Sequence, residues 1–267
     1  LILNNLEFDH ADIFDDLEHI KKHVHHLVRT IPEHGRIICN AESRALEETI
    51  KMGLWSEIEY FSHDKEWSYQ WQGDKQTIDI FYQAKKQGSL TWNLIGHHNA
   101  SNALAAIAAA RHVGVSPAQS IQALSSFKGV KKRMEKIAEL KNGVQIYDDF
   151  AHHPSAIQTT LKGLSQTKKS GRIVAVIEPR SNTMKLGSMK TDLLMSLEVA
   201  DQVYCYTNNL TWDAHKLFKG YPKAMVSDNI NDITHAIVEN HQSKDHIIFM
   251  SNGNFSGIQS KVIALFQ

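Results

Sequence analysis

The chain has 267 residues, which is enough for two domains of ordinary size. Its hydrophobic share of 42% and charged share of 22% are typical of a folded globular protein and exclude an intrinsically disordered chain. The 29 Lys and Arg side chains balance the 29 Asp and Glu side chains, so no general electrostatic attraction to nucleic acid or to an anionic membrane is expected.

The two cysteines and the N-terminal residues bear on location and completeness. Cys39 and Cys205 lie far apart in apolar, strand-like runs, which favours buried, reduced thiols of a cytoplasmic protein over a disulfide framework. No apolar run is long enough to span a bilayer, and no charged start followed by an apolar segment indicates a secretory signal. The chain opens at Leu1 inside a strand-like run, so we expect residues to precede it in the natural protein.

The first half is predicted to begin with strand and helix in alternation and then to become rich in strands. A helix is expected from Ile13 to Ile31, because apolar residues recur there every three or four positions. Aromatic side chains alternate with polar ones further on, which is typical of strands. The expected strands are 1–3, 36–40, 57–61, 67–71, 77–82 and 89–94, and the further helices are 42–52, an alanine-rich helix after Gly96, and 117–127.

Two clusters in this half carry candidate ligand-binding groups. His10 lies between Asp9 and Asp12, and a histidine oriented by a carboxylate can bind a divalent cation. A turn in which an aspartate caps the next helix explains so short a cluster equally simply. Asn99 and Asn102 are three residues apart on one face of the alanine-rich helix, and a carboxamide matches the donor and acceptor edge of adenine. The alternative is that Asn99 only caps that helix.

A glycine and a basic cluster mark a domain boundary near Gly129. We therefore expect one domain at 1–128 and a second at 129–267. Arg133, at the end of the cluster, could reach an anionic phosphate, although a solvated basic linker would look the same. Beyond it strands and helices alternate regularly, which predicts an α/β fold with a mostly parallel sheet covered by helices on both faces. The strands are 136–140, 144–147, 172–177, 202–206 and 246–250, and the helices are 155–164, 190–199, 229–240 and 258–266.

Three of these strands end in polar loops, which parallel pairing would bring to one edge of the sheet. The first loop holds Asp148 and Asp149, which must face opposite ways, so one can serve a ligand while the other caps the loop. Capping of the next helix by carboxylate and histidine alone remains open. The second loop, 178–187, offers Arg180 and Lys185 to substrate carboxylates. The third, 251–257, is a glycine loop that either exposes backbone donors to an anion or forms a simple tight turn.

Four motifs in this order resemble the Mur ligases of peptidoglycan synthesis. They are Asp9-His10 after a strand, Gly96-x-His98-Asn99-x-x-Asn102-Ala103, Lys132-Arg133-Met134-Glu135, and Asp148-Asp149-Phe150-Ala151-His152-His153-Pro154. The resemblance implies the latter part of a central ATPase domain followed by a Rossmann-like, doubly wound C-terminal domain for the amine substrate. The phosphate loop G-x-x-x-x-G-K-[ST] of such domains does not occur in the sequence, so we expect residues 1–267 to be inactive alone.

The resemblance also implies a reaction and residues that carry it. Residues 178–185 and 250–253 look most like the branch that joins UDP-N-acetylmuramate to L-alanyl-γ-D-glutamyl-meso-diaminopimelate in peptidoglycan recycling, with ATP and Mg²⁺ and through an acyl phosphate. The implied roles are Mg²⁺ binding for His10; adenine binding for His98, Asn99 and Asn102; phosphate binding for Arg133; ribose or phosphate contact for Asp149; and peptide binding for Arg180, Ser181, Asn182, Thr183 and Lys185. Some Mur ligases carry a carboxylated lysine, and neither Lys21 nor Lys22 is assigned to that role.

Three other functions remain possible from the sequence. The first is the related ligase that adds L-alanine, which usually carries a different pattern at 178–185. The second is a non-catalytic module that binds nucleotide or muropeptide. The third is a metal-dependent hydrolase, which would require the Asp9-His10 and His152-His153 pairs to converge on one metal.

Overall fold

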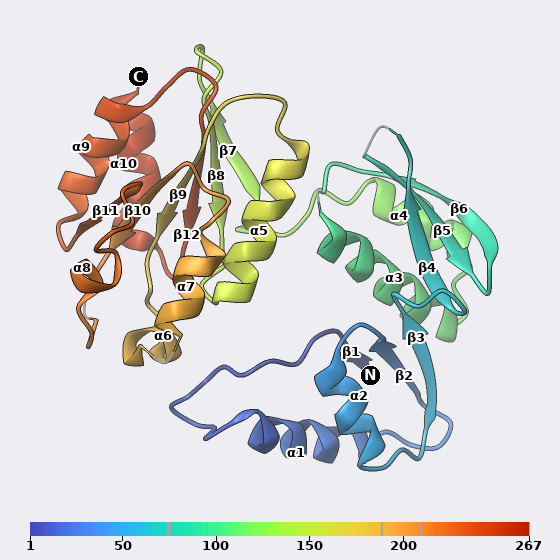
Figure 1. Ribbon diagram of the computed structural model, residues 1–267. Coiled ribbons are helices and arrows are strands. Elements are labelled where there is room, and N and C mark those ends of the chain that lie inside the picture. The colour runs from blue at the N-terminus through green and yellow to red at the C-terminus, as the bar shows by residue number, and fades with distance from the viewer. Residues whose placement is uncertain (74–75, 95, 188, 209, 267) are drawn as a thin grey trace. The chain divides into compact units, whose positions relative to one another are not determined.

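The computed structural model describes residues 1–73, 76–94, 96–187, 189–208 and 210–266 (Figure 1). The chain forms two compact units, residues 1–128 and 129–267. Each unit is built on a six-stranded sheet. Among the described residues, no helix is both long and apolar enough to cross a membrane.

The sheet of the first unit is parallel on one side and antiparallel on the other. Its strand order is β1-β2-β3-β4-β5-β6. The strands from β1 to β4 pair in parallel, and β4, β5 and β6 form an antiparallel meander. The bounds are β1 Ile2–Leu3, β2 Arg36–Asn40, β3 Glu57–Phe61, β4 Trp67–Trp71, β5 Thr77–Tyr82 and β6 Lys85–Thr91.

Helices cover both faces of this sheet. Alternating side chains of β2 separate the two cores, because Ile37 and Cys39 pack with helices α1 (Leu17–Val28) and α2 (Arg44–Lys51), whereas Ile38 packs with α3 (His97–His112). Helix α4 (Pro117–Ser125) packs against α3 and β6. Both cysteines of the protein are free and buried, as predicted, and burial raises the pKa of the Cys39 thiol to about 11.

Helix α1 is shorter than its apolar spacing predicts. It begins at Leu17, because the Asp16 side chain accepts a hydrogen bond from the His19 backbone and so caps the helix. Ile13 therefore lies outside the helix and is 64% exposed, so the prediction that it contributes to the buried stripe is wrong. Lys21 of α1 is buried, and its ammonium group forms ion pairs with Glu18 of the same helix and Glu48 of α2. Lys21 therefore links α1 to α2.

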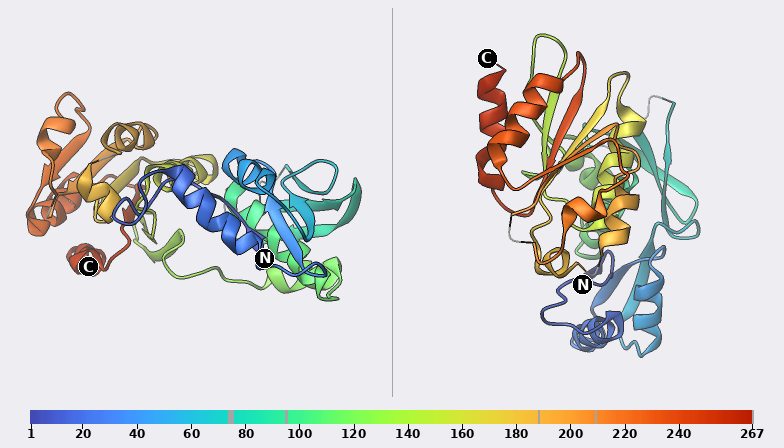
Figure 2. Two further views of the ribbon diagram at one scale, coloured as in Figure 1. Left: turned by 90° about the horizontal axis from the view of Figure 1, so that it is seen from below. Right: turned by 60° about the vertical axis from the view of Figure 1, so that its left-hand side comes forward.

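The second unit has the predicted doubly wound form. Its strand order is β11-β10-β9-β12-β8-β7, and every pair is parallel except β7 with β8. Helices α5 and α7 cover one face, and α9 and α10 cover the other (Figures 1 and 2). The bounds are β7 Glu135–Glu139, β8 Gln145–Asp149, β9 Ile173–Ile177, β10 Gln202–Tyr206, β11 Ala224–Ser227, β12 His246–Met250, α5 Pro154–Thr167, α7 Lys190–Ser196, α9 Ile230–Asn240 and α10 Ile258–Leu265.

Short elements of this unit that were not expected from the sequence include α6 (Asn182–Leu186), α8 (Ala214–Leu217), the edge strand β11 and the 3-10 turn η1 (Phe255–Gly257). Each has three to five residues, which is too short for an apolar period to be recognised. The predicted 178–187 loop consequently contains a helical turn.

Asp245, directly before β12, joins the amino ends of two neighbouring strands. It is fully buried, and its carboxylate accepts hydrogen bonds from Nε and Nη2 of Arg172 at 3.1 and 2.7 Å and from the Gln242 backbone at 2.8 Å. Asp245→Ala removes these bonds to a charged group and should destabilise the unit by about 2 kcal/mol or more. Calorimetry should detect a lower thermal midpoint, whereas Asp228→Ala, at an exposed aspartate, should leave it unchanged. Equal midpoints for the two variants would contradict this role.

Candidate functional site

The polar loops of the second unit meet at the carboxyl edge of its sheet. Strands β8, β12 and β9 are adjacent and parallel, and Met250 of β12 is in register with Asp149 on one side and Ile177 on the other. Asp149 therefore ends its strand level with Met250 and Ile177, and Ser251 and Glu178 come one residue later on the two neighbouring strands. The convergence predicted from the sequence is a consequence of this register.

The two adjacent aspartates face opposite ways. Asp149 is 3% exposed, and its carboxylate accepts hydrogen bonds from the backbone N–H groups of Met134 at 2.6 Å and Ala151 at 2.7 Å. Burial raises the pKa of Asp149, although these donors act in the opposite direction. Asp148 instead reaches the surface, where Gln259 donates to it at 3.0 Å. Asp149 is thus the carboxylate that holds the loop, and the side chain of Asp148 lies on the solvent-accessible side of the strand.

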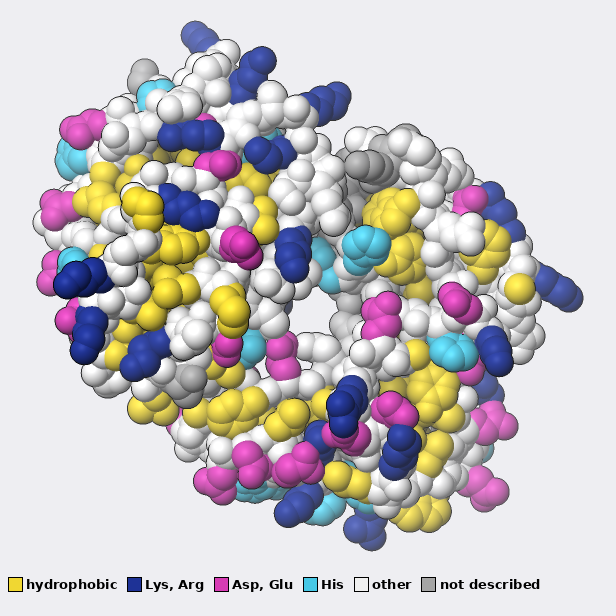
Figure 3. All heavy atoms as spheres, in the orientation of Figure 1, with side chains coloured by type: hydrophobic (Ala, Val, Ile, Leu, Met, Phe, Trp, Pro, Cys, Tyr) yellow, Lys and Arg dark blue, Asp and Glu magenta, His cyan; other side chains and the backbone are white. Residues whose placement is uncertain are grey.

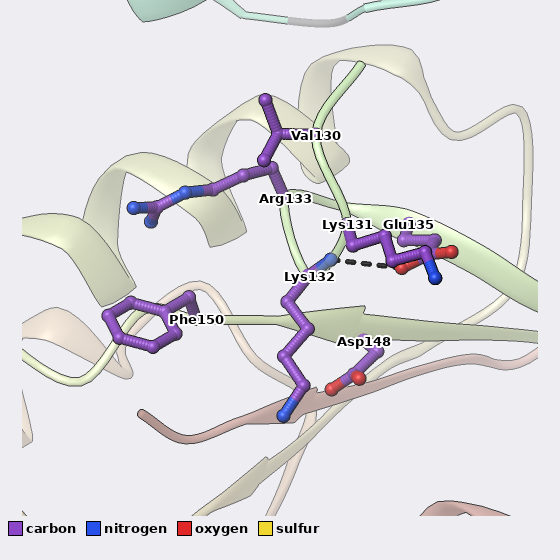
Figure 4. Close-up of a pocket in the computed structure, with 7 residues that line it drawn as sticks. All are labelled: Val130, Lys131, Lys132, Arg133, Glu135, Asp148 and Phe150. Atoms are coloured by element: carbon purple, nitrogen blue, oxygen red, sulfur yellow. Dashed lines mark hydrogen bonds between the residues drawn. The ribbon is translucent and has the colours of Figure 1, made fainter. Parts of the chain in front are cut away.

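A cavity of about 480 Å³ lies beside Asp148 (Figure 4). It is lined by Val130, Lys131, Lys132, Arg133, Glu135, Asp148 and Phe150. The guanidinium carbon of Arg133 lies 5.1 Å from the centre of the Phe150 ring, and Figure 4 shows the Lys132 side chain passing beside Asp148. Three cationic side chains against two carboxylates give this cavity a net positive charge, which suits an anionic group such as a phosphate.

The basic segment before β7 is held in a fixed turn and is not a loose linker. Lys132 and Met134 both have positive φ angles, of 56° and 51°. The Lys132 backbone N–H donates to the Glu135 carboxylate at 2.9 Å, and its carbonyl accepts from the Phe150 N–H at 2.7 Å. Arg133 lies between these tethered residues, so its position is set by the end of β8.

The expected peptide-binding residues of the 178–187 segment differ in exposure. Arg180 and Asn182 are exposed, and Arg180 forms no ion pair with any residue that the structure describes. Ser181 caps α6, because its hydroxyl accepts from the Met184 N–H at 3.3 Å. Thr183 is 1% exposed, and Lys185 is half-buried. Arg180 and Asn182 are therefore the members of this set that a solute can reach most directly.

The candidate adenine-binding residues lie in the first two turns of α3, in the unit formed by residues 1–128. Gly96, with a φ of 91°, occupies the N-cap, so Asn99 is inside the helix and the capping alternative is wrong. Asn102 is exposed, and its side-chain oxygen accepts from Asn4, the residue that follows β1, at 2.8 Å. The hydroxyl of Tyr69 forms a hydrogen bond with Nδ1 of His97 at 2.7 Å, and His97 directly precedes His98 in the sequence. Sequence reasoning did not assign Tyr69 or His97 to this site.

His10 stands in an exposed, strained turn of the first unit. Its φ is 54°, its side chain is 68% exposed, and its N–H donates to the Asp9 carboxylate at 2.7 Å. Figure 3 shows acidic side chains gathered over the start of α1 nearby, where Asp12, Asp15 and Asp16 are exposed. Within the described residues, however, no three His, Cys, Asp or Glu side chains are placed to hold a metal ion. Asp9 and His10 alone do not form the near-octahedral oxygen site that Mg²⁺ requires.

The histidines that follow β8 start the next helix. His153 is the N-cap of α5, since its Nδ1 accepts from the Ser155 N–H at 3.4 Å, and Pro154 occupies the first helical position. This capping was one of the alternatives left open by the sequence. The His152-His153 and Asp9-His10 pairs belong to different units.

The different roles of the two aspartates can be tested by identical substitutions. Asp149→Ala should destabilise the second unit by about 1–3 kcal/mol, because the buried N–H groups of Met134 and Ala151 lose their acceptor. Asp148→Ala is the matched control and should change stability little, because Asp148 accepts its side-chain hydrogen bond from Gln259 at the surface. Calorimetric midpoints check this. A larger loss for Asp148→Ala would reverse the assignment.

Two family descriptions together match most of the chain. Residues 1–110 match "Mur ligase middle domain", and residues 132–253 match "Mur ligase, glutamate ligase domain". The UDP-N-acetylmuramate–L-alanyl-γ-D-glutamyl-meso-2,6-diaminoheptandioate ligases of Escherichia coli and Haemophilus influenzae are 45% and 41% identical to it over 98% of its length. The chain spans 58% and 59% of those two proteins, which is less than two thirds of their length.

Solved structures give the same result. The crystal structure of a murein peptide ligase from Psychrobacter arcticus superposes with a TM-score of 0.72 and 36% identity, covering 99% of this chain and 57% of that one. The UDP-N-acetylmuramate–alanine ligase of Thermotoga maritima, at 19% identity and a TM-score of 0.76, shares the fold. These matches show that the chain belongs to the Mur ligase family and carries its middle and C-terminal domains.

Proposed function

We propose that the full-length protein joins UDP-N-acetylmuramate to the tripeptide L-alanyl-γ-D-glutamyl-meso-diaminopimelate with hydrolysis of ATP. The observation that carries this proposal is the identity of 45% and 41% to two ligases of that description, which extends over both units. Such a reaction belongs to peptidoglycan recycling and takes place in the cytoplasm. Residues 1–267 alone are proposed to be inactive.

The chemistry requires an activated carboxylate, because a carboxylate at neutral pH is a poor electrophile. Transfer of the γ-phosphoryl group of ATP to the sugar's lactyl carboxylate gives an acyl phosphate and ADP. The amine of the tripeptide then attacks the acyl carbon, the bond to the phosphate oxygen breaks, and an amide and inorganic phosphate are formed as the nitrogen loses a proton. Positioning and charge neutralisation account for most of the acceleration in such a reaction.

The residues proposed for the nucleotide are those to which the resemblance assigns adenine, phosphate and metal roles. His98, Asn99 and Asn102 at the start of α3 are proposed to hold adenine, through the donors and acceptors of their side chains. The cationic cavity suits phosphate, so Arg133 is proposed to neutralise transferred charge, with Lys132 beside it. Because Asp148 rather than Asp149 lines this cavity, Asp148 is proposed to make the ribose or phosphate contact, and Asp149 to position the loop. His10 is proposed as the residue of the first unit that would help to hold Mg²⁺, and the ion would neutralise phosphate charge when bound.

The acceptor peptide is assigned to the 178–187 segment. The tripeptide carries several carboxylates, and an exposed guanidinium without an ion pair among the described residues is suited to bind one of them in bidentate fashion. Arg180 is therefore proposed as the main carboxylate-binding residue, with Asn182 and Lys185 as further polar contacts. Ser181 and Thr183 are proposed to shape the segment, since one caps α6 and the other is buried.

A second candidate is the ligase that adds L-alanine, because relatives of that description are 30–34% identical over 76% of the chain. The complete gene product should be assayed with UDP-N-acetylmuramate and ATP, with either the tripeptide or L-alanine as acceptor. The proposal expects phosphate release with the tripeptide at a kcat/KM at least tenfold above that with L-alanine. A preference for L-alanine would favour the second candidate. Failure with both would favour a non-catalytic module.

Arg180→Ala should separate peptide binding from nucleotide binding. Loss of charge-assisted hydrogen bonds to a carboxylate is worth about 1.5–3 kcal/mol, so kcat/KM for the tripeptide should fall about 10- to 150-fold. The KM for ATP should stay within about twofold of wild type. Arg133→Ala is the matched control and should raise the KM for ATP more than that for the tripeptide. Equal losses for both substrates in Arg180→Ala would exclude a peptide-binding role.

A further inference from the structure

We infer that Gly253, held by a buried Glu178–Ser251 pair, positions the guanidinium group of Arg180 for the acceptor. This inference deepens the proposed function, because it rests on Arg180 being a peptide-binding residue. Gly253 and Ser251 follow β12, and Glu178 follows β9. These three residues, called the device below, therefore join the carboxyl ends of two adjacent strands. None of the three needs to touch the peptide for this role.

The closest approach in the device is between Arg180 and Gly253. A Cβ atom at position 253 would lie 2.0 Å from Nη1 of Arg180 and 2.8 Å from its guanidinium carbon. Gly253 is not among the glycines with a positive φ, so its backbone conformation suits any residue. The absence of a side chain at Gly253 therefore leaves the space in which the guanidinium lies directly over the backbone.

The backbone of Gly253 is fixed from two directions. Its N–H donates to Oγ of Ser251 at 3.0 Å, and its carbonyl accepts from Nζ of Lys132 at 2.6 Å. Lys132 lies in the tethered turn that also carries Arg133. The surface on which Arg180 rests is thus tied to the cationic cavity.

The direction of the Ser251 hydroxyl is set by a buried carboxylate. Ser251 donates its single hydroxyl proton to Oε2 of Glu178 at 2.5 Å, which leaves its lone pairs to accept from Gly253. Ser251 is 2% exposed and Glu178 is 8% exposed, so water competes little for these bonds. The Ser251 N–H also donates to the Asp149 carbonyl at 3.1 Å, which links the device to β8.

The backbone of Arg180 starts close to the end of β9. Only Pro179 separates Glu178 from Arg180, and the proline ring restricts the backbone between them. Arg180 thus follows a restricted segment and packs its guanidinium over Gly253, although the side chain remains open to solvent. A side chain held in this way loses less conformational freedom when it binds a carboxylate.

The test is a double-mutant cycle of Gly253→Ala and Arg180→Ala in the full-length protein. The added methyl group displaces the end of a flexible side chain, so Gly253→Ala should keep the thermal midpoint. It should lower kcat/KM for the tripeptide about tenfold, with the KM for ATP within twofold of wild type. In the Arg180→Ala background, the same substitution should have less than a twofold effect, because its target is gone. Gly73→Ala, where a Cβ meets nothing within 4 Å, is the matched control.

Conservative variants of the buried pair provide a second readout. Glu178→Gln keeps an oxygen that accepts from Ser251, so it should retain more tripeptide activity than Glu178→Ala at a similar ATP KM. If Gly253→Ala lowered kcat/KM for the tripeptide by the same factor with and without Arg180→Ala, the inference would be overturned. A crystal structure of Gly253→Ala in which the Arg180 guanidinium has not moved would also overturn it. The crystal structure is independent of activity. A wild-type protein inactive with the tripeptide would instead refute the proposed function.

Discussion

The hydrogen bonds between the buried Asp149 carboxylate and two backbone N–H groups are the interaction on which the candidate site depends. They join the end of β8 to the turn that carries Lys132 and Arg133 and to the start of the following loop. A carboxylate that is 3% exposed loses hydration, and these donors compensate for part of that loss. They are the bonds that attach Met134 to the end of β8, and they add to the Glu135, Phe150 and Gly253 contacts that hold Lys132 in the wall of the cavity.

Glu178 has a comparable role on the far side of β12, just past the end of β9. It is buried there, and through Ser251 it holds the start of the 251–257 loop, whose Phe255 is buried in the core. The interior of the sheet is apolar on both faces, so such carboxylates are confined to the strand ends, where neighbouring backbone donors are free. Exposed cationic side chains are then presented by loops that buried anionic groups hold in place.

The sequence predicted much of this fold because its longer elements carry clear periodic patterns. Strands 202–206 and 246–250 agree with β10 and β12, and the strand rhythm predicted a doubly wound sheet. Elements decided by a few residues were missed: α6 depends on one serine cap, and α1 starts late because Asp16 caps it. Alternation along β8 predicted that the aspartates diverge, but not which one faces inward, because that depends on the Met134 turn.

Other features of the site depend on contacts between residues far apart in sequence. No local pattern reveals that Gly253 accommodates Arg180, since the two are 73 positions apart and the glycine has an ordinary backbone conformation. The pairing of Tyr69 with His97 likewise joins a strand to a helix. The motifs identified the candidate site residues. The three-dimensional contacts showed which of these residues are open to a ligand and which ones hold the loops in place.

A crystal structure of the full-length protein with the tripeptide bound tests the central claim most directly. We predict that a peptide carboxylate lies within hydrogen-bonding distance of the Arg180 guanidinium, with that guanidinium still resting on Gly253 and Asp149 still bonded to Met134. A peptide bound elsewhere, with Arg180 facing solvent, would contradict the account.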